Sequence, residues 1–240
     1  MASPNRSTPR TRRVSLSLLL ATIGLVLSVA NPASASPIKE FFDDLPGISL
    51  RRLVEGGGQF DSQNGDLTFG HFSAEVSGHA LRNLDFYRVI RLDDGFRLYA
   101  PMIALFGSDA QVELGYSVEA ADGQQIDAIS LSFLGGAIFG GTQTRLSAFD
   151  RGGDELATLR VFNTGIFGRN VHADHSRLGE AVNALLVDET IEVRSGLFSL
   201  AWRVDHRFRT APIPEPTTAL LLGLGMAGLA FAGRSGDRAI

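Results

Sequence analysis

The stretch VELGYSVE, residues 112–119, decides the fold class. Its apolar residues alternate with small or polar residues without exception, which is the pattern of a β-strand that buries one face and exposes the other. The alternation recurs often enough to predict strands through the whole middle of the chain. It is found in the segments 96–102, 129–133, 159–161, 191–193 and 198–208.

Short glycine-containing pairs that favour tight turns separate these segments. The pairs are Asn64-Gly65, Asp94-Gly95, Asp122-Gly123, Gly152-Gly153 and Ser195-Gly196. The alternation around residues 67–76 changes phase at Gly70-His71, which predicts a β-bulge there. With no βαβ spacing and no long amphipathic helix, the sequence predicts an all-β, antiparallel β-sandwich of about 8–10 strands. Residues 177–186 fit either a short helix or a loop that enters a strand.

The segment 198–208 carries Trp202, the sole tryptophan of the chain. If the alternation holds over the whole segment, Trp202 shares the apolar face with Val204 and Phe208. We therefore expect its ring to pack in the core. The alternative is a ring exposed on one sheet, where it can stack on a sugar.

The N-terminal segment has the three parts of a secretory signal peptide. Residues 1–13 contain four arginines and no acid, and residues 14–30 are almost wholly apolar. Ala33-Ser34-Ala35 then provides an A-x-A site for signal peptidase, so we expect cleavage before Ser36. The alternative is an uncleaved membrane anchor.

Near the other end, Thr217 to Ala232 forms an apolar run of 16 residues. As a helix it is about 24 Å long, which is shorter than the ~30 Å hydrocarbon core of a bilayer. The run therefore suits a temporary anchor better than a permanent one. Arg234 and Arg238 follow it, and the positive-inside rule places them on the cytoplasmic side.

Just before this run, prolines on both sides of Glu215 hold the chain extended, as a peptidase cleft requires. The tripeptide Pro214-Glu215-Pro216, the apolar run and the arginines together resemble a PEP-CTERM sorting signal. In that family, bacteria that make extracellular polysaccharide export the protein. A membrane-embedded exosortase then recognises the Pro-Glu-Pro motif, cleaves near it, and releases or transfers the protein. The family tail usually ends in a tighter basic run than Arg234 and Arg238 make.

These signals divide the chain into five parts. They are a signal peptide (1–35), a β-sandwich domain (36–209), a linker with the Pro-Glu-Pro motif (210–216), a transmembrane sorting helix (217–233) and a basic cytoplasmic tail (234–240). A β-sandwich before the sorting tail is itself similar to the family pattern.

Composition limits the partners of the sandwich. Residues 36–213 contain 24 acidic and 16 basic side chains, a net charge of −8, which argues against nucleic acid and anionic membrane surfaces as partners. There is no cysteine, so the exported domain depends on packing and not on disulfides.

The sequence offers few residues for chemistry. His172 and His175 are the best metal-binding pair, but no third ligand can be assigned, and a solvated loop explains them more simply. Asp61 to Asp66 resembles a calcium loop without its downstream glutamate, and a hairpin turn at Asn64-Gly65 explains the same residues. No nucleophile elbow, phosphate loop or catalytic cysteine is present. We therefore assign no catalytic residue, metal ligand or cofactor, and we expect no enzymatic activity.

The sequence thus predicts an exported protein, anchored transiently in the inner membrane and then placed at the cell surface or in the extracellular matrix of a biofilm. Its expected partners are signal peptidase, an exosortase-like processing enzyme and extracellular polysaccharide. The leading hypothesis is a structural or adhesive role. A carbohydrate-binding module is the alternative. A glycoside hydrolase comes third, because it requires two carboxylates that converge from separate strands.

Overall fold

The computed structural model describes residues 46–78, 82–165, 168, 170–213, 221–227 and 229. These residues belong to one compact unit, Pro46–Ile240. The predicted signal peptide and its cleavage site, including Ala33, Ala35 and Ser36, lie outside the described residues.

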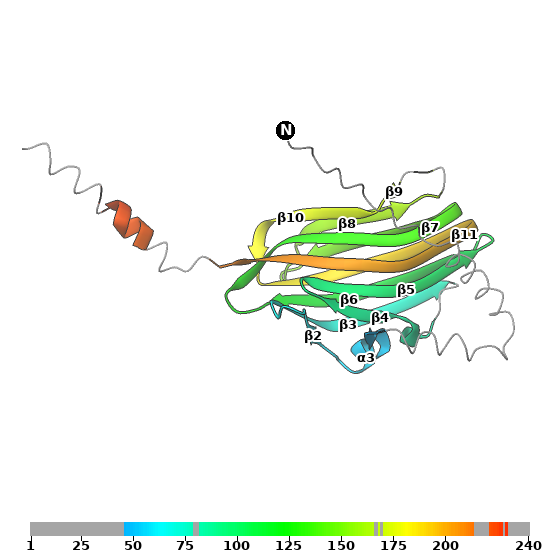
Figure 1. Ribbon diagram of the computed structural model, residues 1–240, viewed down its shortest axis with the longest axis horizontal. Coiled ribbons are helices and arrows are strands. Elements are labelled where there is room, and N and C mark those ends of the chain that lie inside the picture. Colours follow the sequence, from blue (N-terminus) through cyan, green and yellow to red (C-terminus); the bar gives the residue numbers. More distant parts are fainter. Residues whose placement is uncertain are drawn as a thin grey trace, which may run out of the picture. The chain divides into compact units, whose positions relative to one another are not determined.

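Strands make up most of the described chain, and all of their pairings are antiparallel, which confirms the all-β prediction. The elements run in the order β1 (Ile48–Ser49), α3 (Leu50–Glu55), β2 (Phe60–Asp61), β3 (Leu67–Gly78), η2 (Leu84–Phe86), β4 (Arg88–Leu92), β5 (Gly95–Leu105), β6 (Asp109–Ala120), β7 (Gln124–Phe149), β8 (Glu155–Asn163), β9 (Asn170–Val171), β10 (Ala173–Val182) and β11 (Ala184–Pro212) (Figure 1).

The two longest strands, β7 and β11, pair with each other along their whole length and bend together in the middle. Residues 198–207 of β11 pair with β5, whereas residues 184–194 pair with β6. Each bent strand therefore belongs to both sheets of the sandwich. The first layer runs β1-β4-β5-β11(198–212)-β7(124–138)-β10, and the second runs β2-β3-β6-β11(184–195)-β7(140–149)-β8-β9.

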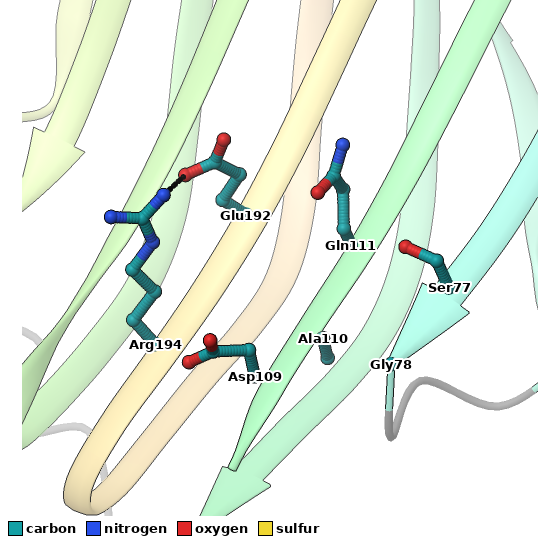
Figure 2. Close-up of a pocket in the computed structure, with 7 residues that line it drawn as sticks. All are labelled: Ser77, Gly78, Asp109, Ala110, Gln111, Glu192 and Arg194. Atoms are coloured by element: carbon teal, nitrogen blue, oxygen red, sulfur yellow. Dashed lines mark ion pairs between the residues drawn. The ribbon is translucent and has the colours of Figure 1, made fainter. Parts of the chain in front are cut away.

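Glycines permit this double bend. A Cβ added at Gly196 of β11 would overlap the carbonyl oxygen of Phe139 in β7, so only glycine lets the two backbones approach this closely. Ser195-Gly196 is thus a bend within one strand, and not the turn between two strands that the sequence predicts. Figure 2 shows β11 reversing direction just beyond Arg194.

Three chain reversals that the structure describes in full meet at this end of the sandwich, which we call the tip. They are the bends of β7 (138–140) and β11 (195–198) and the turn 106–108, which joins β5 in the first layer to β6 in the second. The backbone N–H of Phe106 donates to the carbonyl of Leu197 at 3.1 Å, which fixes two of the reversals side by side. The opposite end, where β11 stops at Pro212, is the exit end.

The core lies between the two layers and is rich in aromatic rings. Phe96 from the first layer contacts Phe69 and Tyr116 from the second, with ring centroids 5.2 and 5.1 Å apart. The alternation that decided the fold class is confirmed, because all four apolar residues of the stretch 112–119 are buried.

Bulges correct the phase of two strands. The bulge predicted at Gly70-His71 is confirmed by a register shift between β3 and β6 and by a positive φ of 54° at His71. A second, unpredicted register shift falls at Trp202. It moves Ser199 and Ala201 into the core and leaves Trp202 half-buried outside it. The expectation of a core tryptophan was therefore wrong.

Two further segments differ from the pattern-based prediction. Residues 177–186 are strand and contain neither a helical turn nor a long loop, since β10 runs to Val182 and β11 starts at Ala184. Strand β11 also extends to Pro212, beyond the predicted domain end at residue 209. Within the described part of the sandwich, α3 is the one α-helix. Its N-cap is Ser49, whose side chain accepts a hydrogen bond from the N–H of Arg52.

Candidate functional site

The exit end holds the connection to the sorting motif. The N–H of Ile213 donates to the carbonyl of Gly123 at 2.9 Å, so the sheet orders the chain to within one residue of the motif. Pro214, Glu215 and Pro216 lie outside the described residues. Residues 221–227 are helical. Among the residues that the structure describes, no helix combines the length and the apolar character needed to cross a bilayer.

The outer face of the first layer carries an aromatic pair, Tyr99 of β5 and Trp202 of β11. Their rings meet edge to face with centroids 6.3 Å apart, and both side chains are half-buried. The bulge turns the indole to this face, while the parity of β5 places Tyr99 there. The pair therefore offers partly exposed aromatic surface of the kind that stacks on apolar faces of ligands.

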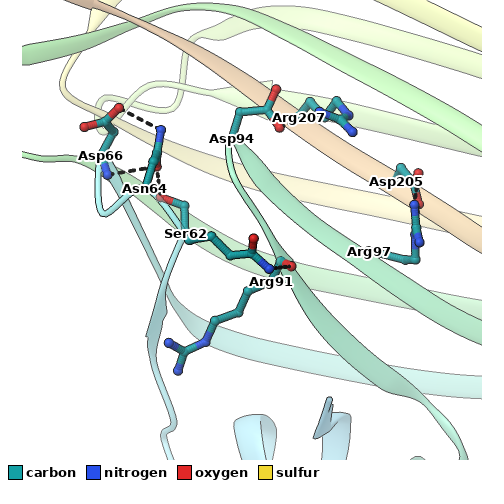
Figure 3. Close-up of polar contacts among 9 residues, drawn as sticks. Ser62, Asn64, Asp66, Arg91, Asp94, Arg97, Asp205 and Arg207 are labelled. Carbon is teal, nitrogen blue, oxygen red and sulfur yellow. Dashed lines mark hydrogen bonds and ion pairs between the residues drawn. The ribbon is translucent and has the colours of Figure 1, made fainter. Parts of the chain in front are cut away.

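A charged network adjoins the aromatic pair, since Arg97 interacts with the side chain of Tyr99. Figure 3 shows Arg97 beside Asp205. Asp205 accepts two hydrogen bonds from Arg97, at 2.7 and 2.9 Å, and Arg203 lies 3.3 Å from the same carboxylate. The hydrogen bond with Asp205 raises the pKa of Arg97 above its usual value. Because the bidentate pair fixes both planar groups, this network is a rigid polar border to the aromatic pair.

The outer face of the second layer has a small hollow close to the tip (Figure 2). Its volume is about 90 Å³, well below the ~300 Å³ at which small-molecule pockets begin. The hollow contains two carboxylates, Asp109 and Glu192, but Arg194 pairs with Glu192 at 3.1 Å. The hollow is therefore too small to serve as a hydrolase cleft, and one of its two carboxylates is already paired with an arginine.

One titratable cluster lies inside the core. His206 Nε2 is 2.7 Å from Glu189 Oε2, and both side chains are wholly buried. The ring of His206 stacks on Phe96 at 4.3 Å. Burial and the charge of Glu189 raise the pKa of Tyr116, which lies next to the pair. Among the described residues, no protein partner is found for Glu189 Oε1 or His206 Nδ1. Because neither side chain reaches the surface, the pair affects the stability of the fold and does not contact a ligand.

The calcium-like segment is a hydrogen-bonded turn between β2 and β3 (Figure 3). Ser62 Oγ donates to Asn64 Oδ1 at 2.7 Å, and Asn64 Nδ2 donates to Asp66 Oδ2 at 2.8 Å. Asp61 accepts from the hydroxyl of Thr68 at 2.8 Å. The side-chain oxygens of this segment thus form hydrogen bonds within the segment and with Thr68, as expected for a hairpin turn.

His175 lies in β10, whereas His172 is the single residue between β9 and β10, so the predicted loop is confirmed only at His172. Asp174, between the two histidines, accepts from the backbone N–H of Arg160 in β8 at 2.8 Å. His172 and His175 are exposed. Among the described residues, no group of three His, Cys, Asp or Glu side chains is placed to hold a metal ion.

Sequence reasoning missed the aromatic pair and its charged border. The outward parity of Arg97 and Tyr99 was visible in the segment 96–102, but nothing in the sequence marks the bulge that brings Trp202 beside them. Asp205 becomes their neighbour only through the pairing of β5 with β11.

Comparison with known proteins gives distant structural likenesses. The chain resembles the enzymatically active domain of tailspike protein 4 of bacteriophage CBA120 (13% identity, 57% of this chain and 19% of that chain covered, TM-score 0.32), so it spans about a fifth of that chain. It also resembles TmCBM61 in complex with β-1,4-galactotriose (16% identity, 69% and 98% covered, TM-score 0.32). A third is the carbohydrate-binding module CBM6cm-2 of Cellvibrio mixtus lichenase 5A in complex with cellotriose (12% identity, 63% and 96% covered, TM-score 0.22).

No curated protein matches the sequence. Residues 212–235 do match a family model, that of the PEP-CTERM protein-sorting motif. The match starts at the last residue of β11, spans the Pro-Glu-Pro tripeptide and ends just after Arg234. The chain is therefore a protein that carries the PEP-CTERM sorting motif directly behind its β-sandwich.

Proposed function

We propose that this chain is an exported bacterial protein of the cell surface or exopolysaccharide matrix, with a structural or adhesive role. The observation that carries the proposal is the sorting motif at residues 212–235, which implies export and processing by an exosortase at the membrane. Signal peptidase acts before Ser36, and the exosortase then acts near Pro214-Glu215-Pro216.

The connection between sandwich and motif suits this order of events. The sheet ends at Pro212 and holds Ile213 through its backbone, so the motif follows folded structure without a long spacer. Two prolines keep the residues around Glu215 extended, which is the conformation a peptidase cleft accepts. Glu215 supplies the one charge of the tripeptide that such a cleft can select.

The sorting step is tested by Glu215→Ala in a host that carries its exosortase, with Glu180→Ala as matched control. Glu180 is an exposed glutamate on β10 and is not part of the motif. The measurement is cell fractionation, with mass spectrometry for the peptide that contains Arg234. We expect wild type and Glu180→Ala to lose this peptide, and Glu215→Ala to keep it and stay with the inner membrane. If all three proteins keep the peptide, the segment is a plain anchor. If all three lose it, another protease cuts and the motif assignment fails.

Glycan binding is the second candidate function, and the aromatic pair of Tyr99 and Trp202 favours it. Sugars bind proteins through partly exposed aromatic rings with hydrogen-bonding groups at their border, and Arg97, Arg203 and Asp205 supply such groups here.

This candidate is tested with Trp202→Ala and with Leu186→Ala, an exposed apolar residue of the second layer, as control. Mobility is measured in native gels that contain the host's own exopolysaccharide. If the pair binds glycan, the polysaccharide retards wild type and Leu186→Ala but not Trp202→Ala, although the variant remains folded. Equal retardation of wild type and Trp202→Ala would remove the aromatic pair from consideration.

A further inference from the structure

Exposed apolar side chains gather at the tip. Among the described residues of the sandwich, six large apolar side chains are strongly exposed, and five of them lie at the tip or on the first layer next to it. The sixth, Leu186, lies near the exit end. The five form what we call the tip patch: Phe106 (80% exposed), Phe139 (65%), Leu134 (50%), Leu197 (44%) and Ile138 (38%).

The tip patch is one surface because its segments are locked together. Leu197 accepts the backbone hydrogen bond of Phe106, and Ile138 is the register partner of Phe198 in the neighbouring strand. The glycine at residue 196 packs directly against the backbone of Phe139. The patch is therefore built on rigid, paired backbone and presents its side chains in fixed positions.

Two of these residues adopt a backbone conformation that is unfavourable for a bulky side chain. Phe106 and Phe139 have φ values of 49° and 51°, in the left-handed region that costs a bulky residue roughly 1–2 kcal/mol relative to glycine. Their rings are mostly in water, so little burial offsets this cost. Strained residues that do not serve the core are commonly found at sites of function.

The distribution of charged residues over the sandwich indicates which partner can dock on the tip patch. The three tip reversals, residues 106–108, 138–140 and 195–198, contain no charged residue. At the exit end, four of the five chain reversals carry aspartate, and the fifth is Asn183 between β10 and β11. The four turns with aspartate hold Asp66, Asp93 and Asp94, Asp122, and Asp150 and Asp154. Two copies of this acidic sandwich can therefore approach each other most closely through their tips, which keeps the acidic ends furthest apart. The same charge opposes binding to an anionic lipid surface.

From these observations we propose that the tip patch is a self-association surface at which a second copy of this chain docks tip to tip. The five side chains expose about 500 Å², taking roughly 200 Å² for a fully exposed Phe and somewhat less for Leu and Ile. A two-fold contact buries the patch of both copies, about 1,000 Å² in total, which is the lower limit for a specific interface. The dimer is therefore weak and reversible.

A tip-to-tip dimer also has a consequence for adhesion, which rests on the adhesive role proposed above. Because the chain leaves the sandwich at the exit end, a tip-to-tip dimer joins two copies whose sorted ends point in opposite directions. Such a dimer bridges two surfaces, or two sites in a matrix, and many weak contacts in parallel give firm adhesion.

The test is sedimentation velocity of protein released from its host, over about 1 to 300 µM, a range that brackets a weak dimer. Phe106→Asn and Phe139→Asn remove the rings, and asparagine tolerates the left-handed backbone, so both variants keep the fold. Leu186→Asn is the control for loss of an exposed apolar residue elsewhere. We expect a concentration-dependent dimer for wild type and Leu186→Asn, and dissociation constants raised at least about tenfold for the two tip variants.

Three outcomes would overturn the proposal. Wild type that stays monomeric over the whole range excludes self-association, and a dimer that persists in both tip variants places the interface elsewhere. Monomeric wild type that binds vesicles of neutral phosphatidylcholine, with binding lost in Phe106→Asn, makes a lipid surface the partner instead. The experiment reads association of purified protein, so it gives the same answer whether or not the sorting test with Glu215→Ala succeeds.

Discussion

The buried pair of Glu189 and His206 allows a sharp test of how this core is held together. Both residues belong to β11, but the bend of that strand places Glu189 in the second layer and His206 in the first. Their 2.7 Å contact therefore joins the two layers through wholly buried polar groups. We expect Glu189→Leu to destabilise the protein because it leaves the imidazole of His206 buried without an acceptor.

The magnitude follows from what remains in the core. A neutral imidazole left unpaired costs about 1–3 kcal/mol, and a charged one about 3–5 kcal/mol. We therefore expect a loss of about 3 kcal/mol, which a domain with a typical stability of ~5–15 kcal/mol survives. The double variant Glu189→Leu/His206→Leu leaves neither partner unpaired, so its loss is smaller than that of either single variant. The resulting coupling energy is at least about 2 kcal/mol.

The assay is urea unfolding followed by the fluorescence of Trp202, the sole tryptophan, for wild type, both single variants and the double variant. Asp127→Asn serves as control because it breaks an ion pair, with Arg209, that is substantially exposed to water. Its cost is below about 1 kcal/mol. If the two single variants cost less than about 1 kcal/mol, or if their losses simply add in the double variant, the pair does not join the layers and the reasoning fails.

Two further predictions concern the backbone and the surface. Gly95→Ala places a Cβ against the carbonyl oxygen of His206, so we expect it to lower the free energy of unfolding by at least about 2 kcal/mol. Gly136→Ala, where a Cβ meets nothing within 4 Å, changes it by less than about 0.5 kcal/mol, and urea midpoints compare the two. The hydrogen bond from Arg209 holds the pKa of Asp127 below its usual value, so the pair stabilises the protein above about pH 4 and this contribution is lost as the pH falls through the lowered pKa. The stability difference between wild type and Asp127→Asn should therefore be measurable at about pH 7 and shrink at about pH 3, and a constant difference would contradict it.

The sequence by itself determined the fold class, because a two-residue period depends only on local order along the chain. Every apolar residue of the stretch 112–119 that the alternation assigned to the buried face is buried. The bulge at Gly70-His71 was also predictable, since a phase change must occur where the apolar parity switches. The sorting motif is equally local, because an enzyme that reads an extended tripeptide and an apolar run reads sequence and not fold.

The position of Trp202 was not predictable, because its bulge interrupts a stretch that alternates without any visible fault. Ser199 and Ala201 lie in the core while the Trp202 ring lies outside it, and this register exists only in the pairing of β11 with β5 and β7. The candidate aromatic pair therefore exists only through long-range register.

Tertiary structure alone decided the double bend of β7 and β11, and with it both candidate surfaces. In the sequence, Ser195-Gly196 has the same form as the turns between strands, so nothing local distinguishes a hairpin from a strand that changes layer. The distinction comes from β7, which lies against β11 on both sides of the bend and keeps the pairing continuous. Through that bend, segments around Phe106, Phe139 and Leu197, far apart in the chain, meet at one end of the sandwich. Local patterning cannot foresee this meeting, because it results from contacts that form only once both layers have closed.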